Sequence, residues 1–334
     1  MRLHVVTGKG GTGKTTVAAA LALGLAAGGR RTLLVEVEGR QNIARLFDVP
    51  ALPYDEQRIA VAPGGGEVYA LAIDAKEALL EYLDVFYRLG RAGKVLEKVG
   101  AVDFATTVAP GVRDVLLIGK VYEAVRRTQP GRGGQGRPVY DAVVLDAPPT
   151  GRITRFLNVN EEVVGLAKVG PIRNQANAVM TLLRSPQAAV HLVTVLEEMP
   201  VQETVDGVAE LLAAHLPVGG VVVNMVTEPF LPGDALERAS AGTLDRDEVL
   251  AGLTAAGLGR RSQATGNDTS PAALTTALLG EAADHASRVA MQRDERKELA
   301  ELARPTYELP LLAGGIDVGA LYELAARLRE QGMS

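Results

Sequence analysis

One stretch near the N-terminus constrains the fold more than any other. The phosphate-loop pattern is matched by Gly8-Lys9-Gly10-Gly11-Thr12-Gly13-Lys14-Thr15, between an apolar run at residues 3–6 and a small-residue helical segment at 17–27. Glycines let successive backbone N–H groups turn toward phosphate oxygens, and the N-terminus of the following helix adds positive potential. The sequence therefore predicts a phosphate-binding loop rather than an ordinary glycine-rich turn.

Several residues of this loop have predicted roles. We expect Lys14 to reach the β- and γ-phosphates, Thr15 to coordinate Mg²⁺ through its hydroxyl, and Thr16 to approach the α-phosphate. The second lysine, Lys9, narrows the interpretation to one branch of dimeric ATPases. ATP or ADP and Mg²⁺ are the expected cofactors.

Composition excludes several classes of function. The chain has 334 residues, of which 47% are hydrophobic, and 35 basic against 40 acidic residues give a net charge of −5. Nothing in this balance indicates direct nucleic-acid binding. There is no cysteine, which rules out disulfides and every thiolate site for zinc, arsenite or an iron–sulfur cluster. Without a signal peptide or a membrane-length apolar run, the protein is predicted to be cytoplasmic, with only transient membrane association through a partner.

Short β-branched runs alternate with longer helical patterns along the chain. Strands are predicted at 3–6, 32–37, 68–73, 142–145, 190–195 and 220–223, with a late edge strand at 306–309. Helices are predicted at 75–99, 112–127, 151–183, 201–215, 271–302 and 318–331. This alternation predicts an α/β P-loop NTPase fold, a mostly parallel doubly wound sheet flanked by helices. We treat residues 1–334 as a single domain with a helical insertion subdomain, at about 75–127 and 153–186.

A second landmark follows the strand predicted at 142–145. That strand ends in Asp146, the position from which a carboxylate holds the water shell of Mg²⁺ beside a phosphate loop. The turn Ala147-Pro148-Pro149-Thr150-Gly151 comes next, where a sensor of the γ-phosphate would lie. An ordinary strand-to-helix connection, with Thr150 capping the helix, is the alternative.

Together these motifs resemble the ATPases that drive arsenical pumps and those that deliver tail-anchored membrane proteins, with their bacterial relatives. The closest likeness is to the actinobacterial branch labelled anion-transporting ATPases. The shared landmarks run in the family's order along nearly the whole chain: the two-lysine loop, residues 146–155, Glu197, Glu203-Thr204, Asn224 and Leu309-Pro310-Leu311.

The resemblance implies roles for individual residues. Lys9 would cross a dimer interface to the partner's nucleotide, and residues 146–151 would form the second switch. Glu197 would lie near the nucleotide, Asn224 would read the adenine edge, and Pro310 and Leu311 would cover the base. From the residues alone, Asn224 is a strand-end asparagine suited to a turn.

The chain departs from the family pattern in two places. Where the relatives have an aspartate that positions the attacking water, this sequence has Glu38, whose extra methylene predicts slow or partner-dependent hydrolysis. Glu36, two residues earlier, is expected to be a poorer substitute. The missing cysteines argue against an arsenite-stimulated or other metalloid pump subunit.

Two functions are favoured by the sequence. The first is an Mg²⁺-dependent ATPase that acts as a nucleotide-switched homodimer, or heterodimer with a paralogous ATPase, and handles a protein partner or a hydrophobic membrane-protein client. The second is a nucleotide-binding assembly subunit with little turnover that forms a complex with a paralogous ATPase. A third, a partitioning or positioning ATPase acting on DNA or membrane, shares the two-lysine loop but would be expected to show a basic surface or a terminal amphipathic anchor. An apolar stripe, Leu79, Leu80, Leu83, Phe86 and Tyr87, suits a core face or a client groove.

Overall fold

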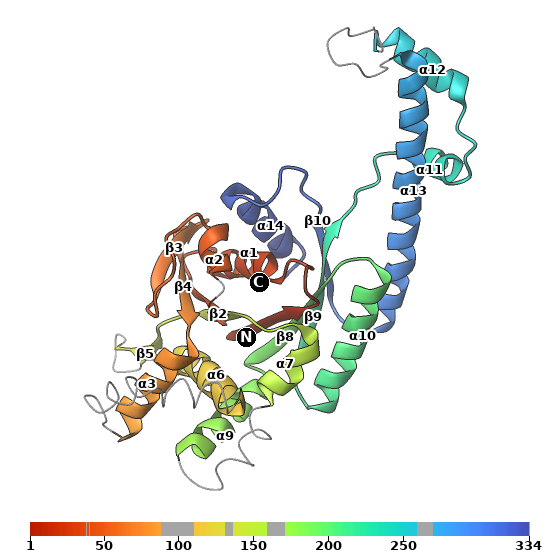
Figure 1. The fold of residues 1–334 in the computed structure, drawn as a ribbon. Coiled ribbons are helices and arrows are strands. Elements are labelled where there is room, and N and C mark those ends of the chain that lie inside the picture. The colour runs from red at the N-terminus through yellow and green to blue at the C-terminus, as the bar shows by residue number, and fades with distance from the viewer. Residues whose placement is uncertain are drawn as a thin grey trace. The chain divides into compact units, whose positions relative to one another are not determined.

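The computed structural model describes residues 1–37, 39, 41–87, 110–130, 136–158, 171–258 and 270–333. The chain divides into two compact units, of which one comprises Met1–Met225 with Leu299–Ser334 and the other Val226–Glu298. The first contains the sheet and the phosphate loop (Figure 1).

The first unit is built on an eight-stranded sheet with the strand order β10-β9-β8-β1-β7-β2-β4-β3. Its strands are β1 Leu3–Gly8, β2 Arg31–Val37, β3 Gln57–Ala62, β4 Gly66–Ile73, β7 Ala142–Asp146, β8 Ala188–Thr194, β9 Val218–Val226 and β10 Thr306–Pro310. A separate two-stranded ribbon pairs β5 Thr128–Gln129 with β6 Arg137–Pro138. The expected late edge strand is β10.

The pairs that β1, β2, β4, β7, β8 and β9 form with one another in this sheet are parallel, and β3 pairs antiparallel with β4. Parallel pairing brings the carboxyl ends of β1, β7, β2 and β8 to one edge of the sheet, where the phosphate loop leaves β1. The register sets Glu36 of β2 opposite Asp146 of β7. Side chains that follow these strand ends therefore meet around the loop.

Helices cover both faces of this sheet. In the first unit the structure describes α1 Lys14–Ala26, α2 Asn42–Leu46, α3 Ala75–Tyr87, α6 Pro110–Arg126, α7 Thr150–Leu157, α9 Pro171–Leu183, α10 Glu198–Ala213 and α14 Val318–Glu330. One buried cluster joins the sheet to α1, α2 and α14, and the other joins it to α3, α6, α7, α9 and α10. The mostly parallel, doubly covered sheet predicted from the sequence is confirmed.

Helix α1 lies between the sheet and α14, and its composition explains this place (Figure 1). Its residues from Val17 to Ala26 are all buried, so it has no polar face. A helix that is apolar all round is stable only when it is covered on every side. The buried helix holds the phosphate loop firmly at its N-terminus.

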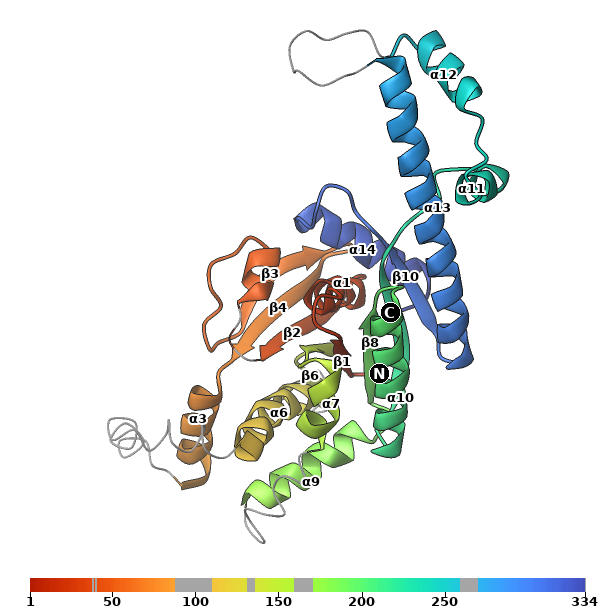
Figure 2. The same ribbon diagram turned by 45° about the vertical axis from the view of Figure 1, so that its right-hand side comes forward.

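The second unit contains α11 Gly233–Ser240, α12 Arg246–Ala255 and most of α13 Pro271–Glu301. Asp245 caps α12 by accepting from the backbone N–H groups of Asp247 and Glu248. Both short helices lie beside α13 (Figure 2), and Arg246 donates to Thr276 Oγ1 at 2.9 Å. This unit was not among the helical insertions expected from the sequence.

Some predicted elements differ from those observed. The helix expected at 151–183 is represented by α7 and α9, and residues 159–170 between them lie outside the described residues. The helix expected at 75–99 is seen as α3 up to Tyr87, and its remainder also lies outside them. Strand β3 was missed, because an exposed antiparallel edge strand carries no continuous apolar run. The single-domain assignment with two insertions stays a prediction.

The apolar stripe on α3 packs inward. Leu79 is buried in the core, and Leu80 and Leu83 pack against it. The side chains of Phe86 and Tyr87 lie outside the described residues.

Candidate functional site

The predicted phosphate loop connects β1 to α1, and its conformation requires glycine at particular positions. Gly8 has φ +154°, and a Cβ there would lie 2.1 Å from the carbonyl oxygen of Val193 on β8. Gly13, the N-cap of α1, has φ +84°, and its Cβ would lie 2.3 Å from Nδ2 of Asn224. Gly11 is also left-handed. Side chains at these positions would clash or be strained, so glycine is needed for the loop to curl against both strands.

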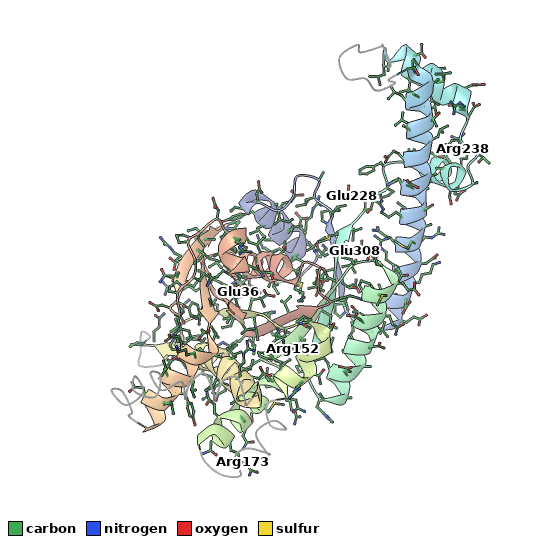
Figure 3. All side chains as sticks on the ribbon, viewed as in Figure 1. Glu36, Arg152, Arg173, Glu228, Arg238 and Glu308 are labelled. Carbon is green, nitrogen blue, oxygen red and sulfur yellow. The ribbon has the colours of Figure 1, made fainter. Side chains whose placement is uncertain are left out.

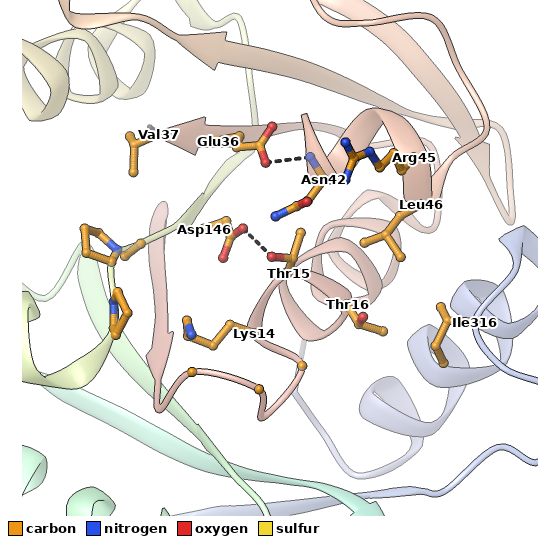
Figure 4. Close-up of a pocket in the computed structure, with 16 residues that line it drawn as sticks. Lys14, Thr15, Thr16, Glu36, Val37, Asn42, Arg45, Leu46, Asp146 and Ile316 are labelled. Atoms are coloured by element: carbon orange, nitrogen blue, oxygen red, sulfur yellow. Dashed lines mark hydrogen bonds between the residues drawn. The ribbon is translucent and has the colours of Figure 1, made fainter. Parts of the chain in front are cut away.

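The first two residues of α1 carry the polar groups expected to bind phosphate and metal (Figure 4). Thr15 Oγ1 donates to Asp146 Oδ2 at 2.7 Å, which joins the helix start to the end of β7. Lys14 Nζ donates to the carbonyl oxygen of Lys9 at 3.0 Å. The structure thus brings together the two predicted Mg²⁺ residues, Thr15 and Asp146, and the predicted phosphate lysine.

These residues line a cavity of about 560 Å³. Of the predicted phosphate-loop and switch residues it contains Gly10, Gly11, Gly13, Lys14, Thr15, Thr16, Asp146, Ala147, Pro148 and Pro149. To these it adds Glu36, Val37, Asn42, Arg45, Leu46 and Ile316. This volume is in the range of small-molecule sites. A glycine cradle at a helix N-terminus suits phosphate, and a hydroxyl beside a carboxylate supplies the hard oxygen ligands that Mg²⁺ prefers. The residues present therefore fit an Mg²⁺-nucleotide.

Two hydrogen bonds of Thr12 hold the phosphate loop in its conformation. Its hydroxyl donates to the carbonyl oxygen of Lys9 at 2.9 Å, and its own carbonyl accepts from Asn224 Nδ2 at 2.9 Å. Thr12 is buried, as is Asn224 at the end of β9. Asn224 therefore fastens the loop to β9, a contact that sequence reasoning did not foresee. Its predicted contact with adenine stays a prediction.

Lys9 is turned toward helix α10. Its ammonium lies 2.8 Å from Glu203 Oε1, and Thr150 Oγ1 donates to Glu203 Oε2 at 3.4 Å. One carboxylate of α10 therefore contacts both the first lysine of the loop and the first residue of α7. Thr150 makes no side-chain cap for α7, whose N-cap is Pro149, so the capping alternative is wrong.

Sequence reasoning undervalued Glu36. This residue is only 1% exposed, and it lies in the interior near the end of β2 (Figure 3). Its Oε1 accepts from the backbone N–H of Asn42 at 2.8 Å, at the first residue of α2. The signal was present in the sequence, because alternation along the strand places Glu36 on the face that α1 covers. Glu38, the predicted catalytic carboxylate, lies outside the described residues.

The remaining predicted residues lie at the periphery. Glu197 is the exposed N-cap of α10, three residues after the end of β8. Pro310 ends β10, and Leu311 is 54% exposed. The cavity is lined instead by Ile316, from the same C-terminal segment. Contacts of Glu197, Pro310 and Leu311 with a nucleotide stay predictions.

Comparison with known proteins agrees with this geometry. The sequence profile of the family described as "Anion-transporting ATPase" matches residues 1–188, which hold the phosphate loop and Asp146. The chain belongs to the anion-transporting ATPase family. The predicted family and the P-loop NTPase fold are thereby confirmed, and ATP hydrolysis is the activity that the family name supports.

Similar proteins carry ATPase names. The chain is 52% identical to ATPase BagA of Mycobacterium tuberculosis over 333 residues, covering 100% of this chain and 94% of that protein. It is 26% identical to ATPase GET3 of Kluyveromyces lactis over 271 residues, covering 71% and 75%. It is 27% identical to the putative arsenical pump-driving ATPase 2 of Aquifex aeolicus over 176 residues, covering 50% and 54%.

Two further properties of the described residues concern membrane spans and metal sites. Within them, no helix is both long and apolar enough to cross a membrane. They also hold no cluster of three histidine, cysteine or acidic side chains that would ligate a metal by themselves.

Proposed function

We propose that this member of the family is an Mg²⁺-dependent ATPase whose nucleotide state opens and closes a dimer. The observation that carries the proposal is the placement of Lys9. Lys14 lines the cavity, whereas the ammonium of Lys9 is directed to Glu203 on α10, and the Lys9 side chain is still 26% exposed. A loop lysine directed away from its own cavity is available to a phosphate presented by a second subunit.

Asp146, Thr15 and Lys14 supply the hydrolytic part of the proposal. Bound Mg²⁺ would draw charge from the β- and γ-phosphates. The chain would contribute Lys14 at the phosphates, the Thr15 hydroxyl and Asp146 at the metal's coordination shell, and a carboxylate near residue 38 to orient water. Because Thr150 follows Asp146 within four residues and contacts Glu203, a change at the γ-phosphate would reach α10 through short contacts.

Dimer closure would be coupled to a partner protein, with a membrane-protein client as one class. A second cavity of about 820 Å³ supports this part, since it opens among α3, α6 and α9. Its lining mixes apolar and aromatic side chains, among them Ala78, Tyr82, Leu116 and Tyr122, with charged ones such as Lys120. A surface of this kind suits a partially apolar protein segment. The protein would act in the cytoplasm and meet membranes through its partner.

A second function is favoured by one observation. The water-positioning aspartate of the family pattern is replaced by Glu38, so ATP binding without efficient turnover would leave an assembly subunit that forms a complex with a paralogous ATPase. Steady-state turnover separates the two functions. A rate that stays near background with the copurifying partner present would favour the assembly subunit.

The test of the dimer switch is sedimentation of the purified chain with Mg²⁺ and ADP, ATP or a nonhydrolysable ATP analogue. We expect a compact dimer with the ATP analogue and a looser dimer or monomer with ADP. A parallel purification from the native cell under each nucleotide identifies a heteromeric partner. Identical sedimentation in all nucleotides, with and without that partner, would rule out the switch.

A further inference from the structure

Met225 has an unusual backbone conformation at the end of β9. Its φ is +56°, in the left-handed region that residues with a side chain seldom adopt. The side chain is 40% exposed, although the preceding residue, Asn224, is only 4% exposed. This conformation is strained for a residue that has a Cβ atom, whereas glycine adopts it without that strain. A favourable contact of the methionine side chain would offset this strain.

The neighbour of this side chain is the phosphate loop. A Cβ built on Gly13 would lie 3.5 Å from Met225 Cε, which is van der Waals distance, and 2.3 Å from Asn224 Nδ2. Asn224 Nδ2 donates to the carbonyl oxygen of Thr12. Asn224 thus contacts the loop through its amide, and the thioether methyl group of the next residue, Met225, lies beside the space where a Gly13 side chain would begin.

These two side chains offer what a nucleotide base needs. A purine has polar edges, which an amide recognises, and flat apolar faces, which a thioether contacts favourably. Phosphates held by the loop keep the base within one nucleotide's length of Gly13. An exposed methionine at that distance presents apolar surface beside the loop.

We propose that Met225 is a specificity-determining residue that contacts the face of the bound purine base beside Asn224. This inference rests on the proposed function, because it requires that the loop bind ATP. It adds a residue that the family resemblance did not supply, since the base contacts expected there were Asn224, Pro310 and Leu311. The same side chain would contribute little to a ligand that has phosphates and no base.

The test compares ATP with inorganic tripolyphosphate, each with Mg²⁺, in calorimetric titrations of Met225→Gly. We expect the Kd for ATP to rise about three- to tenfold, from the loss of one thioether–aromatic contact, and the Kd for tripolyphosphate to stay unchanged. The variant should unfold at the same or a higher denaturant concentration than wild type, since glycine relieves the left-handed conformation. Met225→Leu should recover part of the ATP affinity. Met199→Ala, which removes another exposed methionine on α10, is the matched control and should change neither Kd.

The outcomes separate this inference from the function on which it rests. Equal weakening of ATP and tripolyphosphate would mean that Met225 shapes the loop, and an unchanged Kd for ATP would mean that it does not meet the base. Either result overturns the inference and leaves the proposed ATPase standing. Failure of the wild-type chain to bind ATP at all would overturn the proposed function, and the role of Met225 with it.

Discussion

The ammonium of Lys9 lies 2.8 Å from Oε1 of Glu203, and this contact joins the phosphate loop to helix α10. Both side chains are partly exposed, so the pair contributes at most about 1 kcal/mol and is readily exchanged. A phosphate group from a second subunit would compete with Glu203 for the same ammonium. The ion pair is therefore suited to hold Lys9 in an open state and to release it on closure.

The first prediction concerns Lys9 itself. Lys9→Ala is expected to bind ATP with nearly wild-type affinity, because Lys14 remains in the cavity, but to lose the ATP-dependent dimer and with it turnover. Calorimetry and sedimentation on the same sample measure the two properties. Lys14→Ala is the matched variant and should lose nucleotide affinity instead. Wild-type turnover and dimerisation in Lys9→Ala would contradict the intermolecular role.

The second prediction concerns the other partner of the ion pair. Glu203→Gln keeps the size of the side chain and removes its charge, so Lys9 is released more easily. The ATP concentration that half-saturates dimer closure should fall by up to about fivefold, the equivalent of about 1 kcal/mol. Glu198→Gln, on the same helix and exposed, serves as the control. A higher half-saturating concentration in Glu203→Gln would show that Glu203 supports closure rather than opposing it.

The third prediction concerns the metal. Asp146→Asn retains the acceptor for Thr15 and removes the negative charge, so the Mg²⁺-dependent part of the ATP affinity should disappear. ATP titrations with Mg²⁺ and with EDTA measure this difference directly. Turnover should fall about 100-fold or more, which corresponds to about 2.7 kcal/mol of barrier. An undiminished effect of Mg²⁺ on affinity would place the metal elsewhere.

The fourth prediction distinguishes the two glutamates of the β2 segment. Glu38→Asp removes the extra methylene and is expected to raise turnover about tenfold, or about 1.4 kcal/mol of barrier. The matched change Glu36→Asp withdraws a carboxylate that accepts from the Asn42 N–H, so it should lower the free energy of unfolding by about 1 kcal/mol without raising turnover. Rates indifferent to Glu38→Ala would remove Glu38 from the reaction.

The fifth prediction concerns pH. His4 and His191 are buried on neighbouring strands, stacked, with His4 Nδ1 and His191 Nε2 3.1 Å apart. Burial holds the pKa of both rings below the ordinary value, and nearby positive charge lowers it further. As the pH falls below about 6.5, these histidines become protonated in the unfolded chain but stay neutral in the folded chain. The free energy of unfolding should therefore decline by up to about 1.4 kcal/mol per pH unit for each histidine.

Urea unfolding between pH 7.5 and 5 measures this decline. The double variant His4→Gln/His191→Gln should show a flatter dependence on pH, and His215→Asn, at an exposed histidine, should follow the wild type. An equally steep decline in the double variant would assign the acid sensitivity to other groups.

Much of the fold was determined by the sequence alone. Parallel strands that are covered on both faces are mostly apolar, so residues such as Val5, Val35 and Val144 mark the central sheet without reference to any partner. The phosphate loop could equally be predicted from the sequence, because its glycines meet a local requirement on backbone conformation. Such features depend on residues that are close together in the sequence, so the sequence pattern alone predicts them.

Other features were decided only by the tertiary structure. Lys9 meets Glu203, and Asn224 meets Thr12, across more than 190 residues of sequence in each case. No local propensity encodes such a contact, because it exists only after parallel strands have brought their carboxyl ends to one edge of the sheet. The same assembly buried Glu36 opposite Asp146 and turned Met225 toward the loop. The sequence by itself determined the phosphate loop, and long-range packing determined which side chains surround it.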